Sequence, residues 1–156
     1  MLDKQGRKIE YLRLSITERC TLKCPYCRAD EGLCPKKFEL MPDEFERRAR
    51  VLANIGVNKI RITGGEPLLR RDVIDIISRL SALEGIQEIA LTTNAQQLPG
   101  KAHDLKKAGV SRLNISLDSL DAKKFERITG GGSLEKTMTG IDEALDAGMF
   151  PIKVNA

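Results

Sequence analysis

Apolar and polar residues alternate along several short segments of the chain, which is the pattern of strands that bury only one face. In the first segment, Leu12, Leu14 and Ile16 alternate with Arg13 and polar hydroxyl residues. The same alternation recurs further along the chain. It predicts strands at residues 11–17, 59–63, 88–93, 112–118 and 151–155.

Between these segments, apolar residues return every three or four positions, which is the spacing of an amphipathic helix. Three stripes stand out: Phe45, Ala49, Leu52 and Ala53; Val73, Ile76, Ile77 and Leu80; and Leu134, Met138, Ile141 and Leu145. Asp72 and Ser133 precede two of them and are predicted N-caps. Glycines that suit left-handed helix ends follow the helical stretches, at Gly56, Gly85, Gly109 and Gly148.

The alternation also indicates how the helices are arranged, because strands covered by helices on both faces are apolar throughout. Here one face is polar, so we predict an α/β fold of the parallel (β/α) barrel type, with helices outside and a polar interior. An antiparallel sheet with one solvated face is the alternative, and the helical crossovers disfavour it. A closed barrel needs about 250 residues. The 156 residues present therefore predict one domain, 1–156, that is an incomplete barrel truncated after its fifth strand.

The charge balance excludes some classes of protein. Lys and Arg number 26 against 22 Asp and Glu, giving a net charge of +4, and the two signs are interspersed. Only 4% of the residues are aromatic and there is no Trp, so we expect no nucleic-acid partner. No apolar run approaches the length of a membrane span or a signal peptide core. We therefore expect a cytoplasmic protein with no membrane partner.

Three of the four cysteines lie close together, directly after the first predicted strand. Cys20, Cys24 and Cys27 have the spacing C-x3-C-x2-C. Structural zinc takes four protein ligands, whereas an iron–sulfur cubane held by three thiolates leaves one iron open to a substrate. We therefore predict a cluster, with a zinc site that includes Cys34 as the alternative. The single histidine, His103, is expected on the surface of a polar helix.

A second motif, Thr63-Gly64-Gly65-Glu66-Pro67, follows the second predicted strand. Loops at this end of a (β/α) barrel form the active site. The two glycines allow the backbone to approach a ligand closely, and Glu66 can accept a hydrogen bond from an ammonium group. The motif alone is also typical of an ordinary turn. Its position one strand after the cysteines favours a functional role.

These motifs resemble the radical S-adenosylmethionine superfamily. Longer segments are similar to the GTP 3′,8-cyclase family, also called molybdenum cofactor biosynthesis protein A: YLRLSIT at 11–17, KIRITGGEPLLRR at 59–71, LTTN at 91–94 and NISLDSL at 114–120. The similarity extends over about residues 7–155. It implies a lyase that uses a 4Fe-4S cluster and S-adenosylmethionine to convert GTP into 3′,8-cyclo-7,8-dihydro-GTP by radical chemistry.

The resemblance also implies roles for individual residues. The ligands of the cluster would be Cys20, Cys24 and Cys27. Contacts to S-adenosylmethionine would come from Tyr26 at the adenine, from Ser116 at the ribose, and at the methionine end from Gly64, Gly65 and Glu66. Contacts to GTP would come from Arg13, Arg61, Thr92 and Lys153.

The strand pattern supports the GTP contacts independently. The polar face gathers five cations, Arg13, Lys59, Arg61, Arg112 and Lys153, against one acid, Asp118. A triphosphate suits such an excess of positive charge. Arg13 and Arg61 lie inside predicted strands, where an unpaired buried cation is costly. Arg70 and Arg71 are expected in solvent.

The chain also departs from the family pattern. The second cysteine triad, which holds another 4Fe-4S cluster in the C-terminal part of the family, is absent from these residues, as is a Gly-Gly tail. We therefore expect this chain to bind the first cluster without cyclising GTP. Ala95 stands where the family usually has Gly, so one loop is expected to differ.

The resemblance implies GTP as substrate, an electron donor, and a downstream cyclic pyranopterin monophosphate synthase as partners. Two alternatives remain from the residues themselves. One is a different radical S-adenosylmethionine enzyme, such as a peptide-modifying one. The other is a zinc-binding α/β module.

Overall fold

The computed structural model describes residues 4–27 and 39–156. In these residues, one parallel sheet has the strand order β1-β2-β3-β4-β5. The strands are β1 (Tyr11–Ser15), β2 (Lys59–Thr63), β3 (Glu88–Thr93), β4 (Val110–Ser116) and β5 (Ile152–Asn155). Every predicted strand is therefore confirmed, with small differences at its ends.

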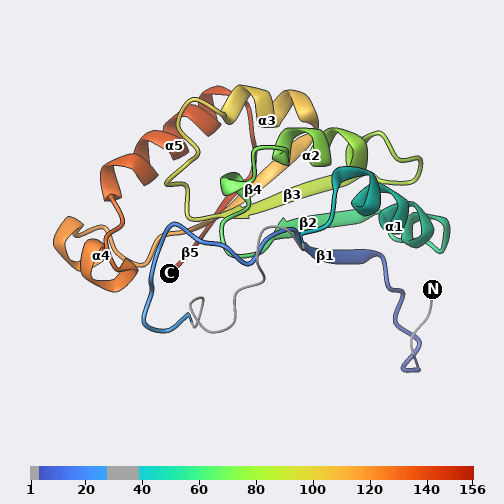
Figure 1. Ribbon diagram of the computed structural model, residues 1–156, viewed down its shortest axis with the longest axis horizontal. Coiled ribbons are helices and arrows are strands. Elements are labelled where there is room, and N and C mark those ends of the chain that lie inside the picture. Colours follow the sequence, from blue (N-terminus) through green and yellow to red (C-terminus); the bar gives the residue numbers. More distant parts are fainter. Residues whose placement is uncertain (1–3, 28–38) are drawn as a thin grey trace.

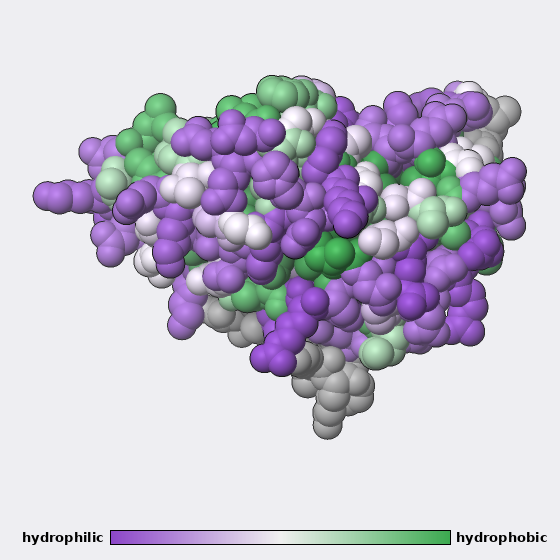
Figure 2. Space-filling view, turned by 90° about the horizontal axis from the view of Figure 1, so that it is seen from above, coloured by the Kyte–Doolittle hydropathy of each residue, from purple (hydrophilic) through white to green (hydrophobic). Residues whose placement is uncertain are grey.

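Helices alternate with these strands. They are α1 (Pro42–Asn54), α2 (Val73–Ser81), α3 (Ala102–Ala108), α4 (Ala122–Thr129) and α5 (Leu134–Asp146), together with the short 3-10 helix η2 (Pro67–Leu69). Figure 1 shows α1, α2, α3 and α5 on one face of the sheet, while the described residues place no helix on the opposite face. Viewed from the helical side, the surface is mostly hydrophilic (Figure 2). Among residues 4–27 and 39–156, no helix has the length and apolar character needed to cross a membrane.

The predicted α/β architecture with helices on one face is confirmed. Within the described residues the sheet is open, with β1 and β5 at its edges. Apolar strand residues such as Ile62 and Leu91 point into the helical layer and are fully buried. The predicted stripe of α2 is buried there as well, and each such side chain contributes about 1.5–3 kcal/mol of hydrophobic free energy.

Helix α5 packs through smaller residues than predicted. Met138 and Leu145 of the predicted stripe are each 38% exposed, whereas Ala144 is fully buried. Gly140 faces the core so closely that an added Cβ would lie 3.0 Å from the Cβ of Leu98. Ile141 of the predicted stripe does pack against the core. The prediction was therefore wrong only in part, because the close approach of α5 selects small side chains at the other contact positions.

The two predicted N-caps have different outcomes. The Ser133 side chain accepts a hydrogen bond from the backbone N–H of Lys136 at 3.3 Å, which confirms the first. Asp72 makes no such bond to its helix. Asp72 occupies the predicted N-cap position, but its carboxylate is held by Arg70 and does not cap the helix.

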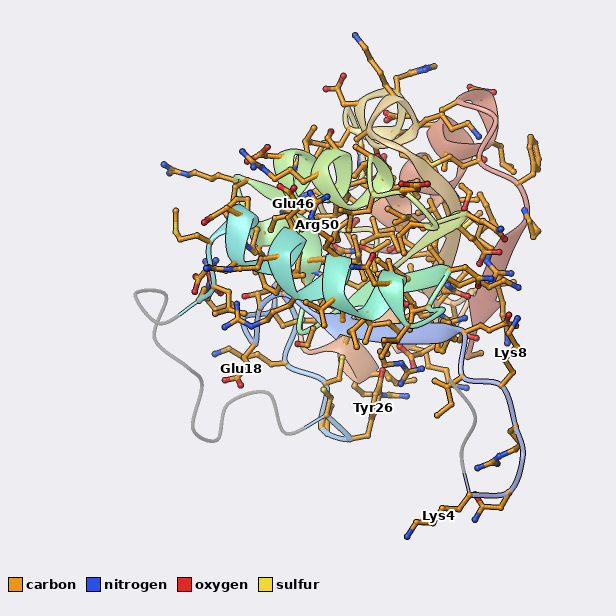
Figure 3. All side chains as sticks on the ribbon, turned by 90° about the vertical axis from the view of Figure 1, so that its right-hand side faces the viewer. Lys4, Lys8, Glu18, Tyr26, Glu46 and Arg50 are labelled. Carbon is orange, nitrogen blue, oxygen red and sulfur yellow. The ribbon has the colours of Figure 1, made fainter. Side chains whose placement is uncertain are left out.

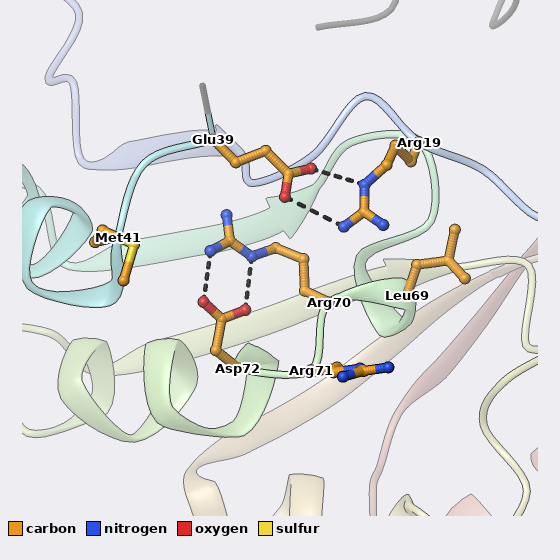
Figure 4. A pocket seen from close by; sticks show the side chains of 7 residues that line it. All are labelled: Arg19, Glu39, Met41, Leu69, Arg70, Arg71 and Asp72. Carbon is orange, nitrogen blue, oxygen red and sulfur yellow. Dashed lines mark hydrogen bonds and ion pairs between the residues drawn. The ribbon is translucent and has the colours of Figure 1, made fainter. Parts of the chain in front are cut away.

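Arg70 joins the two ends of the segment that connects β1 to α1. Its guanidinium donates to the carbonyl oxygen of Ile16 at 2.8 Å and to that of Leu40 at 2.9 Å. It also forms a bidentate ion pair with Asp72, drawn in Figure 4, at 2.8 and 2.6 Å. Arg70 is only 5% exposed, so the expectation of a solvated side chain was wrong, whereas Arg71 is exposed as predicted.

Glu39 forms a second set of contacts between the end of β1 and the start of α1 (Figure 4). Its carboxylate accepts from Arg19 Nε at 3.1 Å and from Arg19 Nη2 at 3.2 Å, and also from the hydroxyl of Thr17. Burial by itself raises the pKa of Glu39, but the bonds from Arg19 and Thr17 outweigh it and lower the pKa below its ordinary value. The ionised form of Glu39 therefore joins residue 39 to Thr17 and Arg19.

Beyond β1 and β2, the backbones of two segments stay in contact. The N–H of Gly65 donates to the carbonyl oxygen of Thr17 at 2.8 Å, and the N–H of Glu66 to that of Arg19 at 2.7 Å. A Cβ on Gly64 would lie 2.2 Å from the Thr17 oxygen, and one on Gly65 would lie 2.3 Å from the Arg19 oxygen. These glycines therefore allow one backbone segment to lie directly against another.

The end of α4 holds the cysteine segment from the other side. The N–H of Lys23 donates to the carbonyl oxygen of Thr129 at 3.0 Å. Gly130 ends α4 in the left-handed conformation, with φ of 66°, and an added Cβ would lie 2.7 Å from the Lys23 oxygen. The hydrophobic pattern did not single out α4.

The Gly130→Ala variant should be less stable than Gly148→Ala. Both glycines have positive φ, 66° and 71°, so both variants carry the cost of a left-handed alanine, about 1–2 kcal/mol. Only the Gly130 variant also displaces the Lys23 carbonyl, since no atom lies within 4 Å of a Cβ at Gly148. We expect an additional loss of about 1–3 kcal/mol, measured by urea unfolding. Equal losses in the two variants would contradict the contact.

The Glu39→Gln variant should lower the free energy of unfolding by about 1.5–3 kcal/mol at pH 7, because it removes charge-assisted hydrogen bonds. The pKa of Glu39 is lowered in the folded state. The advantage of the wild type is therefore complete above about pH 4.5 and disappears as the pH falls through that lowered pKa. Urea unfolding of the apo-protein at several pH values measures it. Glu84→Gln, at an exposed position, is the control and should leave the free energy of unfolding at pH 7 close to that of the wild type.

Candidate functional site

A cavity of about 190 Å³ lies at the carboxyl end of the sheet, between the segment after β1, the loop after β2 and the ends of β3 and β4. It brings together most of the residues predicted for the cluster and for S-adenosylmethionine. From those predictions its lining includes Cys20, Cys24, Cys27, Tyr26, Gly64, Gly65 and Ser116. It also includes Thr92, which was predicted as a GTP contact. Segments far apart in the sequence therefore meet where active-site loops of this fold class gather.

The three cysteines of the cavity are free thiols. Cys20 and Cys24 are partly buried and Cys27 is exposed. Cys20 Sγ accepts from the N–H of Leu22 at 3.4 Å, and Cys24 Sγ donates to the carbonyl oxygen of Thr129 at 3.9 Å. Burial raises the pKa of the Cys20 and Cys24 thiols, so a bound metal must displace their protons.

The arrangement of the thiols fits a cluster. Among residues 4–27 and 39–156, no three Cys, His, Asp or Glu side chains converge on a position for one metal ion. A cubane takes each thiolate on a different iron, so its ligands surround a volume instead of a point. Three thiols that line one cavity have that arrangement. Cys34, the fourth ligand of the zinc alternative, lies outside the described residues.

Glu66 does not line this cavity, because its carboxylate points into the protein. Oε1 accepts from the N–H of Leu68 at 3.0 Å and from the hydroxyl of Thr93 at 2.8 Å, and Oε2 accepts from the N–H of Asn94 at 2.8 Å. The side chain is fully buried. Burial raises the pKa of Glu66, and the three donors oppose that rise. The carboxylate that we expected to meet an ammonium group instead joins the loop after β2 to the end of β3.

Tyr26 bridges the cysteine segment and the residues that follow β4. Its hydroxyl donates to Asp118 Oδ1 at 3.0 Å and to Oδ2 at 3.1 Å. Partial burial raises the pKa of Tyr26, and hydrogen bonds to Cys24 and Asp118 raise it further. Figure 3 places Tyr26 on the side of the sheet opposite α1, away from the surface ion pair of Glu46 and Arg50.

The predicted GTP contacts spread over the open face of the sheet. Of the four, only Thr92 lines the cavity. Arg13 and Arg61 are direct neighbours in the register of β1 and β2, and Arg61 lies over the ring of Tyr11 at 5.3 Å from its centre. No acid among the described residues pairs with either arginine. Lys153 is exposed on β5.

Two details of the charge count were wrong. Arg112 forms an ion pair with Glu88 at 2.6 Å, so this arginine is neutralised by an acid that the sequence count had left out. Arg13 is exposed, because β1 is an edge strand and its outward face is uncovered. Among the described residues, the Nε atoms of both Arg61 and Arg112 are buried without a hydrogen-bond partner, and of these two arginines only Arg112 has an acid beside it.

Several residues of the cavity were not assigned to the site from the sequence, namely Leu22, Thr63, Thr93, Asn94, Asp118 and Thr129. Thr63 and Thr93 end their strands, so the rule that sites form at the carboxyl ends of parallel strands would have found both. Thr129 had no such signal, because it ends α4, whose position was not predicted.

Curated relatives cover this chain almost completely. GTP 3′,8-cyclase of Peptoclostridium acidaminophilum is 50% identical over 158 residues, which cover 99% of this chain and 48% of the relative. GTP 3′,8-cyclase of Listeria welshimeri is 48% identical over 155 residues, covering 98% and 46%. The chain therefore spans about half the length of the curated relatives it matches.

Solved structures share the fold. Streptococcus suis SuiB bound to S-adenosylmethionine superimposes with a TM-score of 0.80 at 22% identity, over 94% of this chain and 33% of SuiB. HydG, a maturase of the [FeFe]-hydrogenase, gives a TM-score of 0.75 at 18% identity, over 92% and 34%. These likenesses confirm the partial (β/α) barrel architecture.

The family is shown by a match that covers most of the chain. Residues 14–156 match the radical SAM superfamily, and the cysteine spacing and the cavity belong to the matched region. This match supports a 4Fe-4S cluster and S-adenosylmethionine as the cofactors. The chain belongs to the radical SAM superfamily.

Proposed function

We propose that this chain carries the part of a GTP 3′,8-cyclase that binds the first cluster, S-adenosylmethionine and part of GTP. The proposal is supported by sequence identity: about half of the residues of this chain are identical to those of enzymes with that name. Those relatives are about twice as long. The whole reaction, including an electron donor, a downstream cyclic pyranopterin monophosphate synthase and a cytoplasmic location, is therefore proposed for the longer protein.

Cys20, Cys24 and Cys27 are the proposed cluster ligands, because they line one cavity with the other predicted contacts. When bound, the reduced cluster supplies the electron for reductive cleavage of S-adenosylmethionine. Gly64 and Gly65 present backbone groups to the same cavity. Glu66 contributes through the loop that it holds in place.

Tyr26 and Ser116 are the proposed contacts for the adenosine part of S-adenosylmethionine. Both line the cavity, from opposite segments of the chain. The hydroxyl of Tyr26 is occupied by Asp118, so its ring is the part that remains to contact a base.

The proposal that GTP is the substrate rests on two neighbouring arginines. Arg13 and Arg61 lie side by side on the open face, and like charges directly opposite each other destabilise a sheet. A polyanion such as triphosphate offsets this repulsion. Thr92 lies on the same face and also lines the cavity, so one continuous surface connects the arginines to the cysteines.

The family's second cysteine triad has no counterpart in these 156 residues. In the family, that triad holds the cluster that meets guanine. We therefore propose that residues 1–156 form a partial-barrel core domain that does not complete the cyclisation alone.

Anaerobic reconstitution with iron and sulfide tests the cluster. The chain should turn brown, and its reduced form should give an electron paramagnetic resonance signal that shifts when S-adenosylmethionine is added. Cys24→Ala should lose the cluster because it removes one of the three ligands, whereas Cys34→Ala should keep it. A colourless protein with stoichiometric zinc, or equal loss of metal in both variants, would contradict the proposal.

Arg61→Ala should weaken binding of GTP to the reconstituted chain by about 10- to 100-fold, because a charge-assisted hydrogen bond contributes about 1.5–3 kcal/mol. Equilibrium dialysis with labelled GTP measures this. Arg79→Ala is the matched control, since Arg79 pairs with Asp75 and Glu46 on the outer helices. The substrate assignment fails if both variants bind GTP as the wild type does.

A further inference from the structure

The orientation of the Asn94 side chain is fixed by its neighbours. Asn94 follows β3 and is only 8% exposed. Its Oδ1 accepts from the N–H of Gln96 at 3.0 Å. A backbone N–H can only donate, so this bond identifies the oxygen end of the amide. The other end, Nδ2, therefore donates to Cys20 Sγ at 3.7 Å and to Thr21 Oγ1 at 3.1 Å.

The backbone of Asn94 is held equally firmly. Its N–H donates to Glu66 Oε2 at 2.8 Å, and its carbonyl oxygen accepts from Thr137 Oγ1 at 3.3 Å. Movement of this backbone away from Cys20 would leave these buried groups without partners, which is costly. The fold therefore presents an N–H group to one particular cysteine sulfur.

The three cysteines differ in the hydrogen bonds they receive. Cys20 Sγ accepts from two N–H donors, Leu22 and Asn94. Cys24 Sγ lies against the carbonyl oxygen of Thr129, which cannot donate, and it receives a hydrogen bond from the hydroxyl of Tyr26. Cys27 Sγ has no donor among the described residues. The N–H donors found among the described residues therefore converge on Cys20 Sγ, whereas the donor at Cys24 is a hydroxyl group.

We propose that Asn94 is a positioning residue that donates an N–H···S hydrogen bond to the Cys20 thiolate and raises the reduction potential of the cluster. Reduction adds negative charge to the cluster and its sulfurs, and a fixed N–H dipole stabilises the reduced state more than the oxidised state. This inference rests on the proposed coordination by Cys20. It does not depend on the identity of the substrate.

Redox titration of the reconstituted chain, followed by electron paramagnetic resonance, tests the proposal. Asn94→Ala should shift the midpoint potential to more negative values. Asn94→Asp should shift it further, because the carboxylate still accepts from Gln96 but places an oxygen near the sulfur. Thr21→Val is the matched control, since it removes the other partner of Nδ2 and leaves the donor at Cys20. Its potential should stay near that of the wild type.

A purely structural role for Asn94 predicts a different result. Cluster content would then fall in both Asn94 variants, while the clusters that remain would titrate at the wild-type potential. That outcome, or a shift of the Asn94→Ala potential to more positive values, would overturn the proposal.

A measurement on the wild type avoids any loss of cluster in the variants. The chain is labelled with ¹⁵N only in the side-chain amide of asparagine, reconstituted and reduced. Pulsed electron paramagnetic resonance should then detect a weak ¹⁵N coupling, because Asn94 is the asparagine that contacts a ligand sulfur. A reduced cluster without this coupling overturns the inference and leaves the cluster assignment standing. A wild-type chain that binds no cluster overturns both.

Discussion

The site depends on one close contact between two backbone segments. Residues 64–66 lie against residues 17–19 with hydrogen bonds of 2.7–2.8 Å and no space for a Cβ. This contact extends the pairing of β1 and β2 beyond the strands themselves. Cys20 follows the contact directly, so its position is set by the sheet, although the segment that carries it is a loop.

The buried carboxylate of Glu66 transmits that order to the neighbouring strand. An unpaired carboxylate in the interior would be strongly unfavourable, but Glu66 accepts from three donors on two segments. One of them is Asn94, whose side chain reaches back to Cys20. A closed path of hydrogen bonds thus runs from the loop after β2 to β3 and returns to the cysteine segment. The acid of the Gly-Gly-Glu-Pro motif therefore has a structural role even without a ligand.

Much of this architecture is readable from the sequence, because it follows from periodicity and from rules of chain topology. The alternation of Ile60 and Ile62 with polar neighbours gave the strands and the helical face. The features that were missed depend on contacts between distant segments. Arg70 looked solvated in the sequence, and only the fold brings the carbonyl oxygens of Ile16 and Leu40 to its guanidinium. Likewise, two of the donors to Glu66, Thr93 and Asn94, lie at the end of the next strand, and no local sequence pattern connects them to Glu66.

Ala95 shows how a departure from the family pattern is accommodated. It is the one residue other than glycine with positive φ among the described residues, at 61°, so the glycine usual in the family suits this backbone better. The methyl group is nevertheless fully buried in the core. The backbone N–H of Ala95 donates to the Thr93 hydroxyl at 2.9 Å, and that hydroxyl donates to the Glu66 carboxylate. The strained conformation is thus fixed by the same network that positions Asn94.

On the open face of the sheet, some arginines are paired with an acid and others are not. Arg112 has its own acid on the adjacent strand, Glu88, whereas no described acid serves Arg13 or Arg61. Adjacent strands are only about 4.8 Å apart, so two neighbouring guanidinium groups repel each other across β1 and β2. The ring of Tyr11 offsets part of this cost for Arg61. No described acid offsets the remaining repulsion, and the proposed binding of an anionic substrate across both strands rests on that observation.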